Sequence, residues 1–233
     1  MTTAVLPLRA VLFDAGNTLL FLDHDRMAAA VGAALGVPLT GARLAAASRT
    51  AARAMEQGRN TDRERTASYL EALFLEAGIP AGRLDEVRAC LARLHGERHL
   101  WSGIAEDAHD ALGRLRDAGL RLGVVSNSDG RVDEALEAAG LRSYFDVVVD
   151  STLAGVEKPD PAIFRPALAA LGVPAAAALY VGDLYEVDVI GARAAGLAAV
   201  LLLPAGAPPR VGCASVHSLG ALADHLLKER LAS

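Results

Sequence analysis

The feature that most constrains this chain is a series of short apolar runs that alternate with segments of helical spacing. Five runs have the composition of strands buried on both faces: residues 10–13, 120–125, 145–149, 178–181 and 197–203. Helical patterns separate the later runs, at residues 108–118, 132–139, 161–171 and 187–195. This alternation predicts right-handed crossovers and an α/β fold with a doubly wound parallel sheet.

A different region separates the first apolar run from the others. Residues 25–98 contain no convincing strand and are rich in Ala, Leu, Arg and Glu, with breaks near residues 36–38, 58–60 and 78–82. The pattern predicts about four helices inserted after the first strand. We therefore expect a core domain of residues 1–22 and 99–233 and a helical domain of residues 23–98.

Composition excludes several classes of function. A net charge of −5 gives no basic field that could hold nucleic acid or anionic lipid. The two cysteines, Cys90 and Cys213, form no CxxC pair and indicate no disulfide framework. No apolar run is long enough to span a bilayer. We expect a cytoplasmic monomer or homodimer that binds neither nucleic acid nor membrane.

Polar residues follow the apolar runs at the points where the strands would end. Asp14 closes the first run, Ser126 and Asn127 follow the second, and Asp183 follows the fourth. Lys158 lies in the segment GVEKPDP, after the third run. Each alone could cap a helix, form a turn or be a solvated lysine. Together they favour a ligand site, because ligands bind beyond the carboxyl ends of parallel strands.

The acidic residues of this group indicate a metal and a nucleophile. Asp14, Asp183 and Asp188 supply the hard oxygen ligands that Mg²⁺ prefers. A carboxylate can also attack phosphorus and form an aspartyl-phosphate that water later hydrolyses. Asp14 is therefore the candidate nucleophile.

The remaining polar residues are suited to binding a phosphate group. The Ser126 hydroxyl and the backbone amides around Asn127, expected at a helix start, can bind phosphate oxygens. Lys158 adds a positive charge close to the anion and the nucleophile. The combination predicts phosphoryl transfer, with Lys158 in a catalytic role.

The chain resembles the haloacid dehalogenase (HAD) superfamily in four stretches: FDAGNTLL, VVSNSDG, GVEKPDPAIF and YVGDLYEVDVIGARAAG. They occur in the family's order along nearly the whole chain. The resemblance implies a Rossmann-like core, a small helical cap inserted after the first strand, and four groups that hold or support Mg²⁺: Asp14, the Gly16 carbonyl, Asp183 and Asp188. It also implies substrate contacts from Ser126, Asn127, Lys158 and Thr18, and the Thr18 hydroxyl would help to orient the nucleophile.

One residue departs from the family's pattern. Phosphatases of the superfamily usually carry a second aspartate where this chain has Gly16, and that aspartate protonates the leaving oxygen and then activates water. General acid–base catalysis contributes about 10² to 10⁴ in rate, so alkyl phosphates are expected to react slowly. Acyl or aryl phosphates depend less on that proton. Asp23, His24 and Asp25 are candidate substitutes, although their pattern is more typical of a polar hinge and helix start.

The function that these residues favour is a Mg²⁺-dependent phosphatase of a small phosphorylated metabolite. A non-catalytic protein that binds a phosphorylated metabolite or a partner is the alternative. The 2-haloacid dehalogenases also lack the second aspartate, but they need no magnesium, and GDLYEVD retains two acids suited to a metal. Phosphonoacetaldehyde hydrolases need a cap lysine, whereas the only lysines here, Lys158 and Lys228, lie outside residues 23–98.

Overall fold

The computed structural model describes residues 7–55, 62–204 and 206–231, so the break predicted near residues 58–60 lies outside them. The chain divides into two compact units. We call Met1–Phe21 with Gly103–Ser233 the sheet unit, and Leu22–Ser102 the helical unit. The sequence placed these boundaries after residues 22 and 98. Within the described ranges, no helix is long and apolar enough to cross a membrane.

The sheet unit is built on six parallel strands in the order β5-β4-β1-β6-β7-β8. Their bounds are β1 Ala10–Phe13, β4 Arg121–Ser126, β5 Val147–Asp150, β6 Ala178–Gly182, β7 Ala198–Leu202 and β8 Ala214–Val216. The predicted α/β, Rossmann-like parallel sheet is confirmed, with all five predicted strands present. Sequence analysis missed β8, because three partly exposed residues do not form an apolar run.

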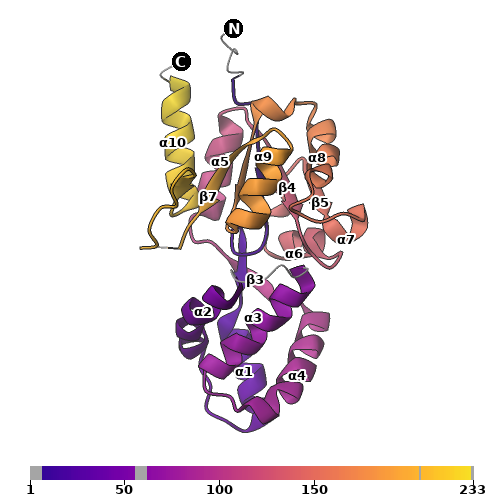
Figure 1. The fold of residues 1–233 in the computed structure, drawn as a ribbon, viewed down its shortest axis with the longest axis vertical. Helices are drawn as coiled ribbons and strands as arrows, with labels where there is room; N and C mark the ends of the chain where they lie inside the picture. Colours follow the sequence, from indigo (N-terminus) through magenta and orange to yellow (C-terminus); the bar gives the residue numbers. More distant parts are fainter. Residues whose placement is uncertain (1–6, 56–61, 205, 232–233) are drawn as a thin grey trace. The chain divides into compact units, whose positions relative to one another are not determined.

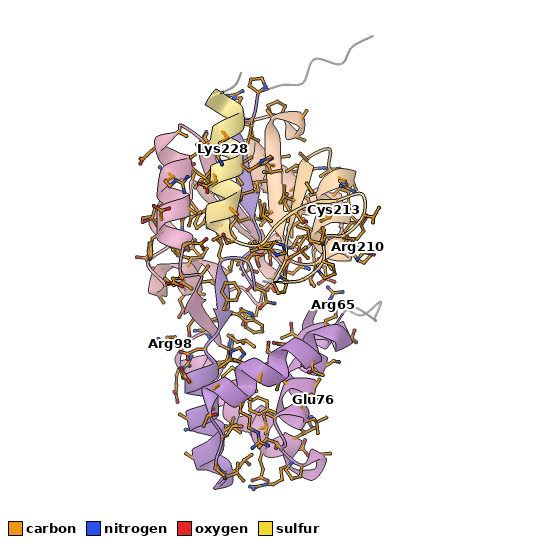
Figure 2. The ribbon with its side chains drawn as sticks, turned by 90° about the vertical axis from the view of Figure 1, so that its left-hand side faces the viewer. Arg65, Glu76, Arg98, Arg210, Cys213 and Lys228 are labelled. Carbon is orange, nitrogen blue, oxygen red and sulfur yellow. The ribbon has the colours of Figure 1, made fainter. Side chains whose placement is uncertain are left out.

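Helices cover both faces of this sheet. Figure 1 shows α8 and α9 on one side and α5 and α10 on the other, and the turned view of Figure 2 agrees. The helices of the unit are α5 Ala108–Asp117, α6 Val132–Ala138, α7 Ser151–Ala154, α8 Phe164–Leu171, α9 Ile190–Ala194 and α10 Leu219–Leu231. Short turns are η2 Arg142–Tyr144, η3 Pro161–Ile163, η4 Ala175–Ala177 and η5 Tyr185–Val189.

The central strand β1 is buried on both faces. Leu12 packs in one cluster with Phe164 and Leu171 of α8. Phe13 points to the other face and meets Phe145 edge to face, with 6.2 Å between ring centroids. Burial on both sides explains why β1 is a continuous apolar run instead of an alternating one.

The strand order reverses at β1, and this brings several strand ends together. The chain runs from β1 outward through β4 and β5 on one side, and through β6, β7 and β8 on the other. Phe13 is in register with Val124 of β4 and Val181 of β6. The residues just beyond these positions therefore lie at one carboxyl edge, at the point where open parallel sheets bind ligands.

The helical unit contains α1 His24–Leu35, α2 Gly41–Met55, α3 Asp62–Glu76, η1 Ala81–Arg83 and α4 Leu84–Glu97. It has its own apolar core, in which Met27, Leu44 and Phe74 are fully buried. Two short strands were not predicted: β2 Leu20–Leu22 and β3 Trp101–Ile104. They pair with each other where the chain passes between the units.

A buried carboxylate shapes the loop that follows β4. Asp150, only 4% exposed, is in register with Ser126 across β4 and β5. Its side chain accepts backbone N–H groups from Gly130 at 3.0 Å, Thr152 at 2.9 Å and Val132 at 3.3 Å. Asp150 therefore fixes the backbone of residues 130–132 beyond β4 and the start of α7 beyond β5.

We predict that Asp150→Ala lowers the free energy of unfolding by about 3 kcal/mol, because three N–H groups lose their acceptor. Urea denaturation followed by circular dichroism measures the loss. Asp160→Ala is the matched control: Asp160 is exposed and accepts one N–H, from Ala162 at 2.8 Å, so about 1 kcal/mol is expected. Equal losses in the two variants would contradict this role of Asp150.

Candidate active site

The centre of the site is a buried cluster of charges around Lys158. The Lys158 ammonium donates to Asp14 Oδ1 at 2.6 Å, to Asp188 Oδ1 at 2.8 Å and to Tyr180 Oη at 2.8 Å. The side chains of Lys158 and Asp188 are only 2% and 1% exposed. A buried ammonium is costly unless its charge and its hydrogen bonds are satisfied, and here each of its three N–H groups has an acceptor.

Asp14 lies at the carboxyl end of β1, where neighbouring strands fix it. Its backbone N–H donates to the Val181 carbonyl at 2.8 Å. The Ser126 hydroxyl, at the end of β4, donates to Asp14 Oδ1 at 3.1 Å. Ser126 and Lys158 thus both bind the same carboxylate oxygen of Asp14, the candidate nucleophile. Sequence analysis expected the charge of Lys158 beside Asp14, but it assigned Ser126 to a phosphate contact.

Asn127 joins the two segments that follow β4 and β5. Its side-chain nitrogen donates to the Lys158 carbonyl at 3.1 Å, and its side-chain oxygen accepts the Lys158 N–H at 2.8 Å. Both polar atoms of the Asn127 side chain therefore bind the Lys158 backbone. The predicted phosphate contact of Asn127 would come from its backbone N–H. The predicted helix start at Asn127 is wrong, because α6 begins only at Val132.

Three carboxylates form a group that could hold a metal ion. One oxygen each from Asp14, Asp183 and Asp188 lies within 4.8 Å of the others. Three carboxylates and one ammonium leave an excess of two negative charges when all are ionised, so Lys158 alone does not neutralise the cluster. A divalent cation would supply the missing charge, and oxygen ligands suit a hard one.

The electrostatics of the cluster follow from burial. Burial raises the pKa of Asp14 to about 6, although the Lys158 charge opposes this rise. Burial, then the charges of Asp188 and Asp14, raise the pKa of Asp183 well above its usual range. Burial lowers the pKa of Lys158, but the Asp14 and Asp188 charges outweigh it, and the net shift is well upward. Lys158 therefore stays charged, whereas protons would compete with a cation for the carboxylates of Asp14 and Asp183.

Asp188 reaches the cluster from a widened helical turn. The α-helix predicted over residues 187–195 begins instead as the π-helical turn η5 and becomes α-helical at Ile190. Asp188 Oδ2 accepts the Leu184 N–H at 2.8 Å, which closes this turn. Gly182 makes room for the carboxylate, because a Cβ at that position would lie 2.4 Å from Asp188 Cγ. Such single π-turns are frequent at functional sites.

Further contacts fix η5 and the helix α9 that follows it. Arg210, labelled in Figure 2, lies over the Tyr185 ring at 3.8 Å from its centroid and donates to Glu186 at 3.1 Å. In α9, Gly191 lets the helix approach the loop of Lys158, because a Cβ there would lie 3.0 Å from Pro159 Cα. This close approach is a physical reason for the first glycine of the GAxxAG stretch.

The turn after Asp14 carries the other predicted residues of the first motif. Gly16 forms a bridge with Leu20, and Thr18 is fully buried, with no hydrogen-bond partner for its hydroxyl among the described residues. The predicted ligand role of the Gly16 carbonyl and the predicted orienting role of Thr18 stay predictions. Asn17 was missed: it adopts a left-handed φ of 54°, and its side chain acts to lower the pKa of Asp183, against the larger effect of burial.

The candidate substitutes for the missing acid/base belong to the helical unit. Asp23 caps α1 by accepting the Arg26 N–H at 3.0 Å, and it also pairs with Arg98 at 3.0 Å. Asp25 packs so closely against Gly41 that a Cβ there would overlap its carboxylate. His24 Nε2 is buried, with no partner in the described part of the chain. The contacts of Asp23 and Asp25 fit the helix start that their pattern indicates.

Tyr180 is the second residue that sequence analysis missed. It lies within the apolar run of β6, where an aromatic residue is expected to fill the core. Its ring does so, packing edge to face on Phe164 with 5.0 Å between centroids. The only signal for a further role was a hydroxyl in an otherwise apolar strand, three residues before Asp183.

Comparisons with known proteins agree on one family. The family model for haloacid dehalogenase-like hydrolases matches residues 8–196. A ribulose-1,5-bisphosphate 5-phosphatase of Halopiger xanaduensis is 32% identical over 185 residues, 72% of this chain and 74% of that protein. Haloacid dehalogenase-like hydrolase domain-containing protein 3 of Bos taurus is 44% identical over 99 residues, 42% of this chain but only 39% of that protein.

A solved structure shows the same fold over nearly the whole chain. It is the crystal structure of YfnB of Bacillus subtilis bound to magnesium. The TM-score is 0.66 at 24% sequence identity, and the match covers 95% of this chain and 100% of that one.

We predict that Asp14→Asn stabilises the metal-free protein above pH 6. The folded chain holds the Asp14 proton up to a pKa of about 6, whereas an unfolded chain releases it near 3.8. Stability therefore falls as pH rises through this window, and the full penalty, on the order of 3 kcal/mol, is present above it.

Urea denaturation in the presence of a chelator tests this expectation. The stability difference between Asp14→Asn and wild type should be small below about pH 4 and should grow up to about pH 7. Asp160→Asn changes an exposed carboxylate and serves as the control. A wild-type protein that is more stable than Asp14→Asn at neutral pH would contradict the burial cost assigned to Asp14.

Proposed function

Because this chain belongs to the haloacid dehalogenase-like hydrolases, we propose that it is a magnesium-dependent phosphatase of a small phosphorylated metabolite, with Asp14 as its nucleophile. One observation carries the proposal: Asp14 stands at the carboxyl end of the central strand, with Ser126 and Lys158 bound to one of its oxygens. The helical unit would act as the cap that selects the substrate.

The donor set fits Mg²⁺. Asp14, Asp183 and Asp188 offer only hard oxygen atoms, and Mg²⁺ binds through one or two carboxylates together with substrate phosphate. Asp14 and Asp183 would hold the ion, Asp188 would support it, and the bound ion would offset the charge of the phosphate and the carboxylates. The excess negative charge of the cluster supports this assignment, since no second buried lysine or arginine lies among the described residues.

The residues of the chain then have distinct roles. Both side-chain contacts of Asp14 fall on Oδ1, so we assign the attack on phosphorus to Oδ2. The bond from phosphorus to the leaving oxygen breaks as the aspartyl-phosphate forms, and water later cleaves the new bond to release phosphate. Lys158 would hold the nucleophile and offer positive charge to the phosphoryl group. The Asn127 backbone N–H would contact the phosphoryl oxygens, and the Ser126 hydroxyl would do so by turning away from Asp14 Oδ1.

Gly16 determines which substrates can react quickly. It has no side chain that could protonate the leaving group or activate water, so the leaving group must depart as an anion. Acyl and aryl phosphates satisfy this requirement, whereas an alkyl phosphate loses about 10² to 10⁴ in rate without a general acid. We therefore assign substrates with acidic leaving groups to this site.

Gly16 also favours the second candidate function, a protein that binds a phosphorylated metabolite without turning it over. The same cluster would then act as a binding site only. The 2-haloacid dehalogenase alternative has less support, because Asp183 and Asp188 retain two carboxylates that halide chemistry does not need.

We predict that the protein releases phosphate from aryl or acyl phosphates only when Mg²⁺ is present. Asp14→Asn should lower kcat by at least about 10³-fold, because the nucleophile is lost. A panel of phosphorylated compounds, assayed for phosphate release with Mg²⁺ and with a chelator, measures this. Tight binding of a phosphorylated compound without turnover would favour the binding protein, and halide release without Mg²⁺ would favour the dehalogenase.

We predict that Gly16→Asp speeds hydrolysis of alkyl phosphates much more than that of aryl phosphates. The new carboxyl group can protonate the leaving oxygen, and the expected gain in kcat/KM for alkyl phosphates is about 10². Gly16→Asn, which has the same size but no acid, is the matched control and should show no gain. An equal gain for both substrate classes would show that proton donation to the leaving group is not what limits this enzyme.

A further inference from the structure

Tyr180 connects the core of the sheet to the charged cluster. Its side chain is fully buried in β6, and its hydroxyl donates to the Val125 carbonyl at 2.7 Å. The same oxygen accepts the Lys158 ammonium at 2.8 Å and lies 3.3 Å from Asp188 Oδ1. A hydroxyl has a single proton to donate, and the shorter contact assigns that proton to Val125.

This hydroxyl completes the set of acceptors around Lys158. An ammonium group has three N–H donors on a flexible stem and can rotate. Asp14, Asp188 and Tyr180 accept one each, so the group is held from three directions. Without the Tyr180 hydroxyl, one donor would face the ring of the residue at position 180, and the ammonium could turn away from Asp14.

The partners of the hydroxyl come from three separate segments of the site. Val125 directly precedes Ser126 on β4, Lys158 lies in the loop before η3, and Asp188 lies on η5. The ring of Tyr180 fills the core, a task that phenylalanine would also perform. The hydroxyl adds nothing to that packing, and all of its contacts are with this site.

We propose that Tyr180 is a positioning residue, whose hydroxyl fixes the Lys158 ammonium against Asp14 and ties it to the strand that carries Ser126. The expected effect on catalysis rests on the proposed function. Tyr180 acts through Lys158 and Val125 and requires no contact with substrate.

The variant Tyr180→Phe removes only the hydroxyl. We expect kcat to fall about 10- to 100-fold, as is typical when a group that orients a catalytic residue is lost. KM should stay within about twofold, since the hydroxyl binds no substrate. Tyr69→Phe is the matched control: the Tyr69 hydroxyl is also buried, pairs with Ser48 at 2.7 Å and lies in the helical unit. It should leave kcat unchanged.

A second measurement does not depend on turnover. The sequence has only two lysines, Lys158 and the exposed Lys228 labelled in Figure 2, so selective ¹⁵N labelling of lysine gives two side-chain NMR signals. In wild type, the Lys158 ammonium protons should exchange with water at least about tenfold more slowly than those of Lys228. Tyr180→Phe should remove this protection, and Tyr69→Phe should keep it.

The outcomes separate the two proposals. Unchanged protection of Lys158 in Tyr180→Phe, unchanged kcat in an active enzyme, or a change in KM alone would each overturn the positioning role. A wild-type protein that releases no phosphate refutes the proposed function. The proton-exchange measurement alone then tests whether the Tyr180 hydroxyl holds the Lys158 ammonium in place. Tyr180→Met, which also lacks the hydroxyl, replaces Tyr180→Phe if that variant does not fold.

Discussion

The contact between the Lys158 ammonium and the carboxylates of Asp14 and Asp188 is the interaction on which the site depends. These groups are nearly inaccessible to water, so the ammonium is tolerable only because the two carboxylates accept its hydrogen bonds and offset its charge, whereas the carboxylates repel each other. The ammonium stays protonated and the carboxylates retain excess negative charge. Lys158 offsets only part of the charge of Asp14, Asp183 and Asp188, and a divalent cation next to the candidate nucleophile would offset the rest.

The sheet topology makes this contact available. Asp14, Ser126 and Asp183 are far apart in sequence, but they lie at or directly after the ends of three strands that are side by side in register. Two glycines then allow the remaining groups to close in. Gly182 leaves space for the Asp188 carboxylate, and Gly191 lets α9 approach the loop that carries Lys158. The site therefore depends as much on absent side chains as on the charged ones.

Much of this could be predicted from the sequence, because buried parallel strands and the residues that end them have a clear pattern. The sheet and the convergence of Asp14, Ser126 and Lys158 followed from that pattern. Contacts that depend on side-chain geometry could not. Nothing in the run ALYVG shows that the Tyr180 hydroxyl accepts from Lys158, and nothing in VVSNSDG shows that Asn127 turns its amide to the Lys158 backbone. The strands β2, β3 and β8 were missed, because they are recognised by hydrogen bonds to a neighbouring strand and not by an apolar run in the sequence.

The central claim is that Asp14 is a nucleophile beside a magnesium site held by Asp183. A crystal structure grown with Mg²⁺ and beryllium fluoride, which mimics a phosphoryl group on a carboxylate, tests it most directly. The account predicts the fluoride adduct on Asp14 Oδ2, Lys158 still bound to Oδ1, and Mg²⁺ bound by Asp14 and Asp183. An adduct on another residue, or Mg²⁺ bound away from these carboxylates, would contradict it.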